Sequence, residues 1–174
     1  MDVKKKLTDR DVRILYIPPM TVASIHKIGN RAEGDSGDLL HQFIKEKNIP
    51  VVKPDFRHFG FNHPNGQKQD GSDHGYERWI SIPDDMLVEQ PFTKIKFNGG
   101  LYAAWMIPMG LFEEWGSLWD WTENNEKYIR VAGNPEKMDG LIEEHLNYIN
   151  IYTKSWEELD KCMQLDLLIP IKEK

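Results

Sequence analysis

The sequence predicts an α+β fold in which a unit of strand, helix, strand and strand occurs twice. Residues 22–29 (VASIHKIG) are echoed by residues 102–110 (YAAWMIPMG), and an amphipathic helical pattern follows each segment. Two later segments recur in the same order, residues 61–65 with 143–147 and residues 79–83 with 167–170. Neither unit can bury an apolar face alone, so the two should pack as a pair with pseudo-twofold symmetry and a groove at their junction. Such grooves commonly bind small molecules.

The length and composition indicate one globular domain, residues 1–174, with repeat halves at about residues 11–83 and 92–171. The chain is 40% hydrophobic and mixes both signs of charge, which is typical of a folded protein with a substantial core. Its formal charge of −6 argues against a protein that mainly grips phosphates, because that role needs clustered Lys and Arg. We therefore expect no direct contact with nucleic acid.

Cysteine use and hydropathy indicate a cytoplasmic protein. Cys162 is the single cysteine, which excludes an internal disulfide and fits a reducing compartment. No segment reaches the ~18 consecutive apolar residues that a membrane span needs, and the N-terminus lacks the apolar core of a signal peptide. We expect no membrane association.

The first half begins with two predicted strands and a helix. Residues 13–17 and 21–28 are β-rich and are separated by two prolines, which cannot join a strand ladder. Residues 29–37 are polar and glycine-rich, which predicts a loop. A helix is predicted at residues 36–48, capped by Asp35 or Ser36. Four apolar residues fall on one face of this helix: Leu39, Leu40, Phe43 and Ile44.

Two further strands complete the first half. They are predicted at residues 56–61 and 76–82, and a loop rich in Gly, Asn, Asp and Pro joins them at residues 62–75. This loop is too long for a tight hairpin.

The second half follows the same plan with larger side chains. Strands are predicted at residues 92–97 and 101–107 on either side of Asn98-Gly99, a strong signal for a two-residue turn. A helix is predicted at residues 111–122, with its apolar stripe at Leu111, Trp115, Leu118 and Trp119. The last two strands are predicted at residues 141–147 and 164–171.

Aromatic residues crowd into the second half and into the strands that should lie beside it. The repeat model brings together Trp105, Trp115, Trp119 and Trp121 with Trp79, Tyr76 and Tyr102. Aromatic side chains bury a large area with few torsions to order, so they make good walls for flat or cationic organic ligands. Each one taken alone is also explained as a core residue.

Two glutamates stand in apolar surroundings. Glu143 has the neighbours Leu141, Ile142 and Leu146, and Glu77 lies near Trp79. A carboxylate that faces a partly dry cavity has a raised pKa unless a cation or donor compensates. It then serves as an anchor for cationic ligands or as a general acid or base. Strand alternation places Glu77 and Trp79 on one face, while Tyr76, Arg78 and Ile80 point the other way. A solvated face explains Glu77 equally well.

Other site chemistries lack a pattern. The six histidines have no recognised metal-ligand spacing, so we expect no metal. The sequence has no glycine-rich phosphate loop, dinucleotide fingerprint or nucleophile-elbow serine, so we expect no cofactor.

Five segments in order carry a family resemblance: PMTVA (19–23) with Gly29, YERWISIP (76–83), GLYA (100–103) with Gly110, Trp115, Leu118 and Trp119, IEEHLN (142–147), and LDLLIPI (165–171). This set resembles the gyrase-inhibitor-like (GyrI-like) small-molecule-binding domain, which is also the effector-binding domain of multidrug-responsive bacterial transcription activators. The resemblance covers the chain from Arg13 onward. It implies antiparallel sheets that form a central aromatic cleft.

The resemblance also implies site residues. A pocket glutamate belongs at Glu143, with His145 where a tyrosine is common, or at Glu144 if the register differs by one. Adjacent strand residues face opposite sides, so only one of the two can be in the pocket. The remaining residues that we expect to contact the ligand are Tyr102, Trp105, Trp119, Trp79 and Glu77.

Two function classes follow from the resemblance. The first is a sensor or sequestering module for apolar, often cationic, aromatic compounds, either a stand-alone binding domain or a fragment, since about a dozen residues precede the first strand and leave no room for a helix-turn-helix module. The second is a hydrolase that opens cyclopropane-bearing alkylating natural products with Glu143 as general base. The family name also points to DNA gyrase as a partner. Both function classes need the same pocket, and turnover distinguishes them.

Overall fold

The computed structural model of the chain describes residues 6–66, 68–147, 155, 158 and 161–174. Its elements along the chain are β1 (Arg13–Ile17), β2 (Met20–Ile28), α1 (Ala32–Glu46), α2 (Ile49–Val52), β3 (His58–Asn62), β4 (Gly75–Ile82), β5 (Thr93–Phe97), β6 (Gly100–Pro108), α3 (Glu114–Asn124), β7 (Tyr128–Arg130), the 3-10 helix η1 (Pro135–Gly140), β8 (Ile142–His145) and β9 (Gln164–Glu173).

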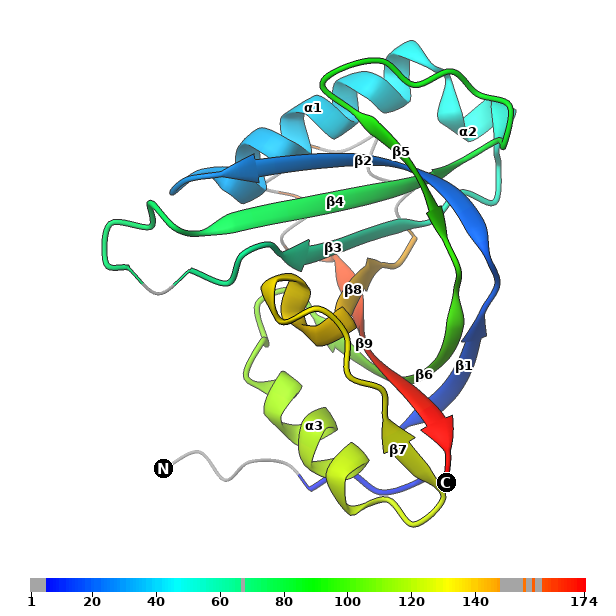
Figure 1. Cartoon of the computed structure of the whole chain (residues 1–174), viewed down its shortest axis with the longest axis vertical. Coiled ribbons are helices and arrows are strands. Elements are labelled where there is room, and N and C mark those ends of the chain that lie inside the picture. The colour runs from blue at the N-terminus through cyan, green and yellow to red at the C-terminus, as the bar shows by residue number, and fades with distance from the viewer. Residues whose placement is uncertain (1–5, 67, 148–154, 156–157, 159–160) are drawn as a thin grey trace.

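The described strands form one curled antiparallel sheet (Figure 1). Their order is β1-β6-β9-β8-β3-β4-β2-β5, and β7 pairs with β9. From one edge of the sheet inward the order is β6-β9-β8, after the edge strand β1, and from the other edge it is β2-β4-β3, after the edge strand β5. The elements β2, α1, β3 and β4 of the first half therefore correspond to β6, α3, β8 and β9 of the second half. The duplicated α+β fold class predicted from the sequence is confirmed, and the two halves meet where β3 pairs with β8.

The strands on either side of Asn98-Gly99 do not pair with each other. Instead, β5 pairs with β2 and β6 pairs with β1. The first strand of each half is therefore an edge strand that pairs with the other half. The register places Ile17 opposite Gly100 and Met20 opposite Phe97, so the connections β1–β2 and β5–β6 lie against each other. Gly99 has a φ of +66°, and a Cβ on it would lie 2.1 Å from the carbonyl oxygen of Ile17. The turn therefore serves a close crossing of two backbones and closes no hairpin.

Helix α1 begins earlier than predicted, at Ala32 instead of residue 36. Neither Asp35 nor Ser36 caps it, and the Ser36 hydroxyl donates to the carbonyl of Glu33 inside the first turns. The buried stripe of α1 extends back from the apolar residues through Gly37, Ser36 and Ala32. These small residues let the helix approach the sheet closely, and a pattern based on large apolar side chains does not detect them.

Helix α3 begins later than predicted, at Glu114 instead of residue 111. Leu111 precedes the helix and is 43% exposed. Leu118 and Trp121 are the large side chains that α3 buries. Gly110, with a φ of +96°, and hydrogen-bonded turns between residues 108 and 116 precede the helix. The apolar stripe is thus rotated relative to the predicted one.

The remaining differences are small. Three predicted strands shift by two residues at one end, since β3 covers His58–Asn62, β8 covers only Ile142–His145 and β9 continues to Glu173. Three short elements lacked a sequence signal and were not predicted: α2, β7 and η1.

The sheet has two apolar faces. On one face, α1 lies over β2 and β4 and α3 lies by β6 and β9, and buried residues such as Leu40, Ile80, Leu118 and Leu167 form one cluster (Figure 1). The opposite face carries a second cluster built around Phe59 and other residues of β3, β6 and β9. Because side chains alternate along each strand, every strand residue is assigned to one face or the other. Among the described residues, no helix is long and apolar enough to cross a membrane.

Candidate functional site

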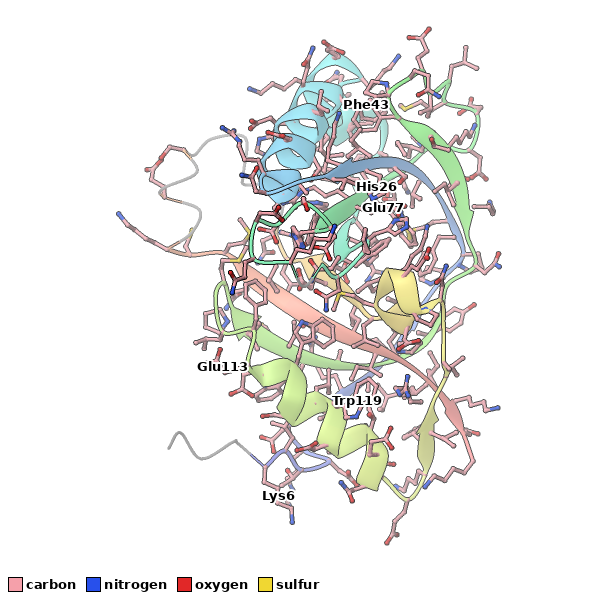
Figure 2. The ribbon with its side chains drawn as sticks, turned by 60° about the vertical axis from the view of Figure 1, so that its left-hand side comes forward. Lys6, His26, Phe43, Glu77, Glu113 and Trp119 are labelled. Carbon is pink, nitrogen blue, oxygen red and sulfur yellow. The ribbon has the colours of Figure 1, made fainter. Side chains whose placement is uncertain are left out.

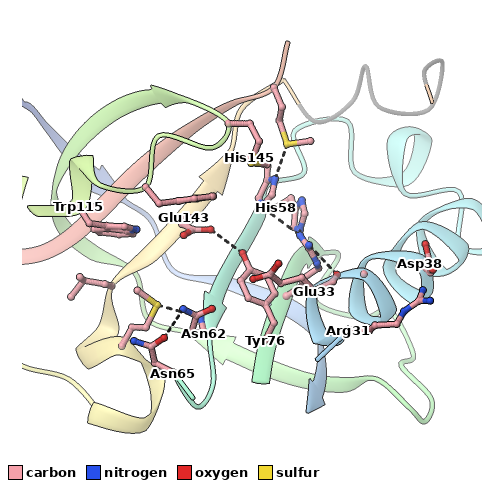
Figure 3. Close-up of a pocket in the computed structure, with 17 residues that line it drawn as sticks. Arg31, Glu33, Asp38, His58, Asn62, Asn65, Tyr76, Trp115, Glu143 and His145 are labelled. Atoms are coloured by element: carbon pink, nitrogen blue, oxygen red, sulfur yellow. Dashed lines mark hydrogen bonds between the residues drawn. The ribbon is translucent and has the colours of Figure 1, made fainter. Parts of the chain in front are cut away.

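A cavity of about 930 Å³ opens on the helix-covered face, between the two halves (Figure 3). It is lined by the start of α1, by β3, β4 and β8, and by the segment that leads into α3. Its volume lies in the range of small-molecule sites. Figure 3 shows Trp115 and Glu143 on one side of the cavity and Arg31, Glu33 and Asp38 of the α1 region on the other, with Tyr76 between them.

The pairing of β3 with β8 positions the central polar residues. Gly60 of β3 is opposite Glu143 on one side and Arg78 of β4 on the other. A Cβ on Gly60 would lie 2.2 Å from the Tyr76 hydroxyl oxygen, so the absent side chain leaves the space that the tyrosine ring occupies. The Tyr76 hydroxyl crosses β3 and donates a 2.9 Å hydrogen bond to Oε2 of Glu143.

Glu143 is a buried carboxylate, 8% exposed, that faces the cavity. Burial raises the pKa of Glu143, and hydrogen bonds from Tyr76 and Trp115 lower it only in part, so the pKa remains above its ordinary value. Among the described residues, no Lys, Arg or His lies within ion-pair distance of Glu143. Burial, and then the Glu143 charge, raise the pKa of Tyr76 well above 10, which keeps its hydroxyl a donor.

The neighbouring Glu144 faces the opposite side of the sheet. Arg57 donates to both of its carboxylate oxygens, from Nε and Nη2, each at 2.5 Å. This bidentate ion pair satisfies Glu144. Of the two adjacent glutamates, Glu143 is the one that lines the cavity.

Arg78 lies on the other side of Tyr76 and contacts neutral groups. Its Nε donates to the Ser36 hydroxyl at 3.2 Å, its Nη2 donates to the Glu33 carbonyl at 3.1 Å, and its Cζ lies 4.8 Å from the centre of the Tyr76 ring. Its Nη1 lies 3.4 Å from Nε2 of His58 and 3.5 Å from Nε2 of His145.

The two histidines form a stacked pair. The His58 and His145 rings are 4.1 Å apart and nearly parallel. Burial, together with the charge of Arg78, holds the pKa of each imidazole well below 6.5. Both rings are therefore neutral near pH 7 and present Nε2 as an acceptor to Arg78.

The second half supplies the apolar part of the wall. It consists of three methionines, a leucine and two aromatic residues: Met109, Phe112, Trp115, Met138, Leu141 and Met163. Methionine side chains adapt their shape, and the aromatic rings provide flat faces.

Of the seven predicted site residues, the structure places Glu143 and His145 in the cavity wall. Trp105 packs against the core cluster on the helix-covered face. Trp119 of α3 lies under the guanidinium of Arg130, with Cζ 4.1 Å from the ring centre. Tyr102 is buried on the opposite face of the sheet, where burial raises its pKa to about 12. These three residues do not line the cavity.

Glu77 and Trp79 also lie on the opposite face, as strand alternation predicted for the pair. The Glu77 carboxylate accepts from the Trp79 indole at 2.6 Å and from the Ser24 hydroxyl at 2.7 Å, and it contacts His63 and Lys137. Figure 2 shows Glu77 close to His26. Burial alone would raise the pKa of Glu77, but these donors lower it below its ordinary value. A ligand contact of Glu77 and Trp79, like that of Tyr102, Trp105 and Trp119, stays a prediction.

Several cavity residues were not predicted as site residues. Tyr76 and Arg78 were assigned to the face opposite Trp79, which is correct, but the sequence did not show that this face is the hollow one. Trp115 was predicted in the helix and in the aromatic cluster but was not named as a ligand contact, and His58 carried no signal. Within the described part of the chain, no group of three His, Cys, Asp or Glu residues could hold a metal ion.

Comparisons with known proteins agree with this architecture. Residues 13–171 match the family model Cass2, described as integron-associated effector binding protein. No curated protein matches the chain significantly. Among solved structures, the EcmrR C-terminal domain is similar with a TM-score of 0.65 at 14% identity, covering 94% of this chain and 98% of that one.

Two structures from Listeria innocua are also similar. An uncharacterized conserved protein has a TM-score of 0.63 at 11% identity, covering 94% of this chain and 93% of its own. A protein described as a hydrolase has a TM-score of 0.63 at 10% identity, covering 94% and 92%. At these identities the likeness shows a shared fold.

Proposed function

We propose that this chain, which belongs to the family of integron-associated effector binding proteins, binds apolar, cationic aromatic small molecules in the cavity around Glu143. The role we propose is that of a cytoplasmic sensor or sequestering protein. Effector binding is the property that the family description names. The finer ligand class rests on the cavity's own chemistry.

One observation carries the proposal. Glu143 is a buried carboxylate at an apolar wall, and its described hydrogen-bond partners, Tyr76 and Trp115, are neutral donors. A buried carboxylate without a cation is costly, and a ligand that supplies the cation relieves that cost. The Trp115 ring and the methionines of the wall offer an apolar surface for the body of such a ligand.

The test is the affinity for rhodamine 123, a planar cationic dye, measured by fluorescence anisotropy. Wild type should bind, and Glu143→Gln should bind about 10- to 100-fold more weakly, because it loses a charge-assisted contact. Glu144→Gln is the matched control: it removes the neighbouring carboxylate, which faces away from the cavity, and should leave the affinity within about twofold. Equal affinity of Glu143→Gln and wild type would refute the anchor role.

A second candidate function is hydrolysis. The raised pKa of Glu143 and its contact with Tyr76 suit a general base that deprotonates a water molecule. The oxygen of the water would bond to a strained cyclopropane carbon of an alkylating compound, and a C–C bond of the ring would break. The carbon that keeps the bonding electrons would take up the proton that Glu143 removed from the water. Glu143→Gln should then lower turnover by about 10²- to 10⁴-fold with binding largely kept.

Mass spectrometry of a cyclopropane-bearing alkylator incubated with the protein tests this candidate. If ring-opened product forms no faster with the protein than in buffer, hydrolase activity is excluded and the proposed binding function stands. DNA gyrase finds no support as a partner in the comparisons, and the ligand is the partner that we propose.

A further inference from the structure

The cavity carries two uncompensated charges of opposite sign. Glu143 has no cation within ion-pair distance among the described residues, and Arg78 has no carboxylate at such a distance within the same residues. Both acceptors of Arg78 at shorter range, the Ser36 hydroxyl and the Glu33 carbonyl, are neutral. The nearby histidine rings are neutral as well. A half-buried guanidinium in such surroundings keeps its full positive charge.

Tyr76 separates the two charges. Its hydroxyl contacts Glu143, and the face of its ring contacts Arg78. No described hydrogen bond or ion pair joins Glu143 and Arg78 directly. Burial raises the pKa of Glu143 by more than the charge of Arg78 lowers it, so Arg78 compensates the carboxylate only in part. A molecule that lies along the Tyr76 ring passes from the carboxylate to the guanidinium, and the cavity has room for it.

The other charged residues of the lining lie at the exposed rim. Arg31 precedes α1, Glu33 and Asp38 lie within it, and all three side chains are exposed to solvent. Arg31 is also paired with Asp35, at 3.3 Å. Solvent and salt screen these rim charges, so the two charges deeper in the cavity dominate its polarity.

We propose that the cavity selects zwitterionic aromatic compounds, with the cationic part of the ligand at Glu143 and a carboxylate or similar anionic group at Arg78. This inference rests on the proposed binding function and narrows its ligand class. Arg78 is a specificity-determining residue in this arrangement. Its planar, forked donors suit a carboxylate better than a lysine ammonium does.

Two dyes with one ring system provide the test. Rhodamine 110 carries a free carboxylate where rhodamine 123 carries a methyl ester, so the ratio of their dissociation constants isolates the anionic group. Wild type should bind rhodamine 110 about 10-fold or more tightly than rhodamine 123. Arg78→Gln should reduce this ratio to about one, and Arg78→Lys should keep part of it.

Arg10→Gln is the matched control, because it removes an exposed arginine that lies outside the cavity lining, and the ratio should stay within about twofold of wild type. Binding of rhodamine 123 without a preference for rhodamine 110 overturns the inference and leaves the proposed function standing. An unchanged ratio in Arg78→Gln also overturns it. Binding of neither dye to wild type overturns both. Since the wild-type ratio alone is decisive, the test does not depend on the stability of Arg78→Gln.

Discussion

The hydroxyl of Tyr76 lies 2.9 Å from Oε2 of Glu143, and this hydrogen bond joins strands that belong to different halves of the chain. The contact crosses Gly60, where β3 of the first half pairs with β8 of the second. The centre of the cavity is therefore also the seam of the duplicated fold.

Gly60→Ala should damage the seam. The new Cβ would lie 2.2 Å from the hydroxyl oxygen and 2.8 Å from two ring carbons of Tyr76, so the side chain must move and its hydrogen bond to Glu143 must lengthen or break. We expect a loss of about 1–3 kcal/mol in the free energy of unfolding, measured by urea denaturation. Gly34→Ala is the control, since a Cβ there meets no atom within 4 Å and alanine favours the helix. Equal stability of Gly60→Ala and wild type would contradict the tight crossing.

The stability of wild type and Glu143→Gln should diverge with pH. The pKa of Glu143 is raised in the folded state. At a pH between the ordinary carboxyl pKa and this raised pKa, the folded protein therefore holds a proton on Glu143 that the unfolded chain has lost. This contribution to stability is present below the ordinary carboxyl pKa and is lost as the pH rises through the raised pKa. Glu143→Gln should therefore gain stability relative to wild type on going from pH 4.5 to pH 8 in denaturant titrations.

Glu77→Gln should show the opposite trend. Donors around Glu77 lower its folded pKa, so its contribution is present above the ordinary carboxyl pKa and is lost as the pH falls through the lowered value. At pH 8, Glu77→Gln should be less stable than wild type, and the difference should shrink in acid. If the two variants show pH trends of the same sign, the assigned environments of the two buried carboxylates are wrong.

Dye affinity should fall in acid. Protonation of Glu143 removes the anion that contacts a cationic ligand, so the dissociation constant for rhodamine 123 should rise as the pH falls through the raised pKa of Glu143. Burial holds the pKa values of His58 and His145 well below 6.5, so these two imidazoles titrate at lower pH than ordinary histidines do. Fluorescence anisotropy between pH 8 and pH 5 measures the effect, and Glu143→Gln should show a flat profile.

Two tryptophans of α3 should differ in their effect on binding. Trp115 lines the cavity and donates to Glu143, whereas Trp119 lies under Arg130 outside the cavity lining. Trp115→Phe should weaken rhodamine 123 binding about 3- to 10-fold, and Trp119→Phe should leave it unchanged. A larger loss in Trp119→Phe would favour the ligand contact predicted from the sequence.

The sequence was most informative where local patterns decide the structure. The order of strands and helices, the duplication and the apolar stripe around Leu40 and Phe43 all follow from periodicity. Errors occurred where small residues form a helix, as at Ala32 and Gly34, because a run of small side chains resembles a loop. They also occurred at Asn98-Gly99, where a turn that usually closes a hairpin serves a crossing of two connections.

The site was predicted less completely than the fold. Glu143 and His145 line the cavity, and their contact with a ligand stays a prediction. The alternation of Glu77 with Arg78 on β4 agrees with the structure. Alternation along a strand did not show which face of the sheet carries the cavity. A strand pattern shows which residues share a face, but it does not show what covers that face. For this reason Tyr76 and Arg78 were not among the predicted site residues.

The sequence by itself determined the family, the duplicated plan and the presence of a glutamate in an apolar segment, because each is written in residues close together along the chain. Tertiary structure decided which residues meet Glu143. Tyr76 lies 67 positions away, and only the register between β3 and β8 and the missing side chain of Gly60 bring the two side chains together. Register across a seam is set by the packing of both halves at once, and no local pattern encodes it.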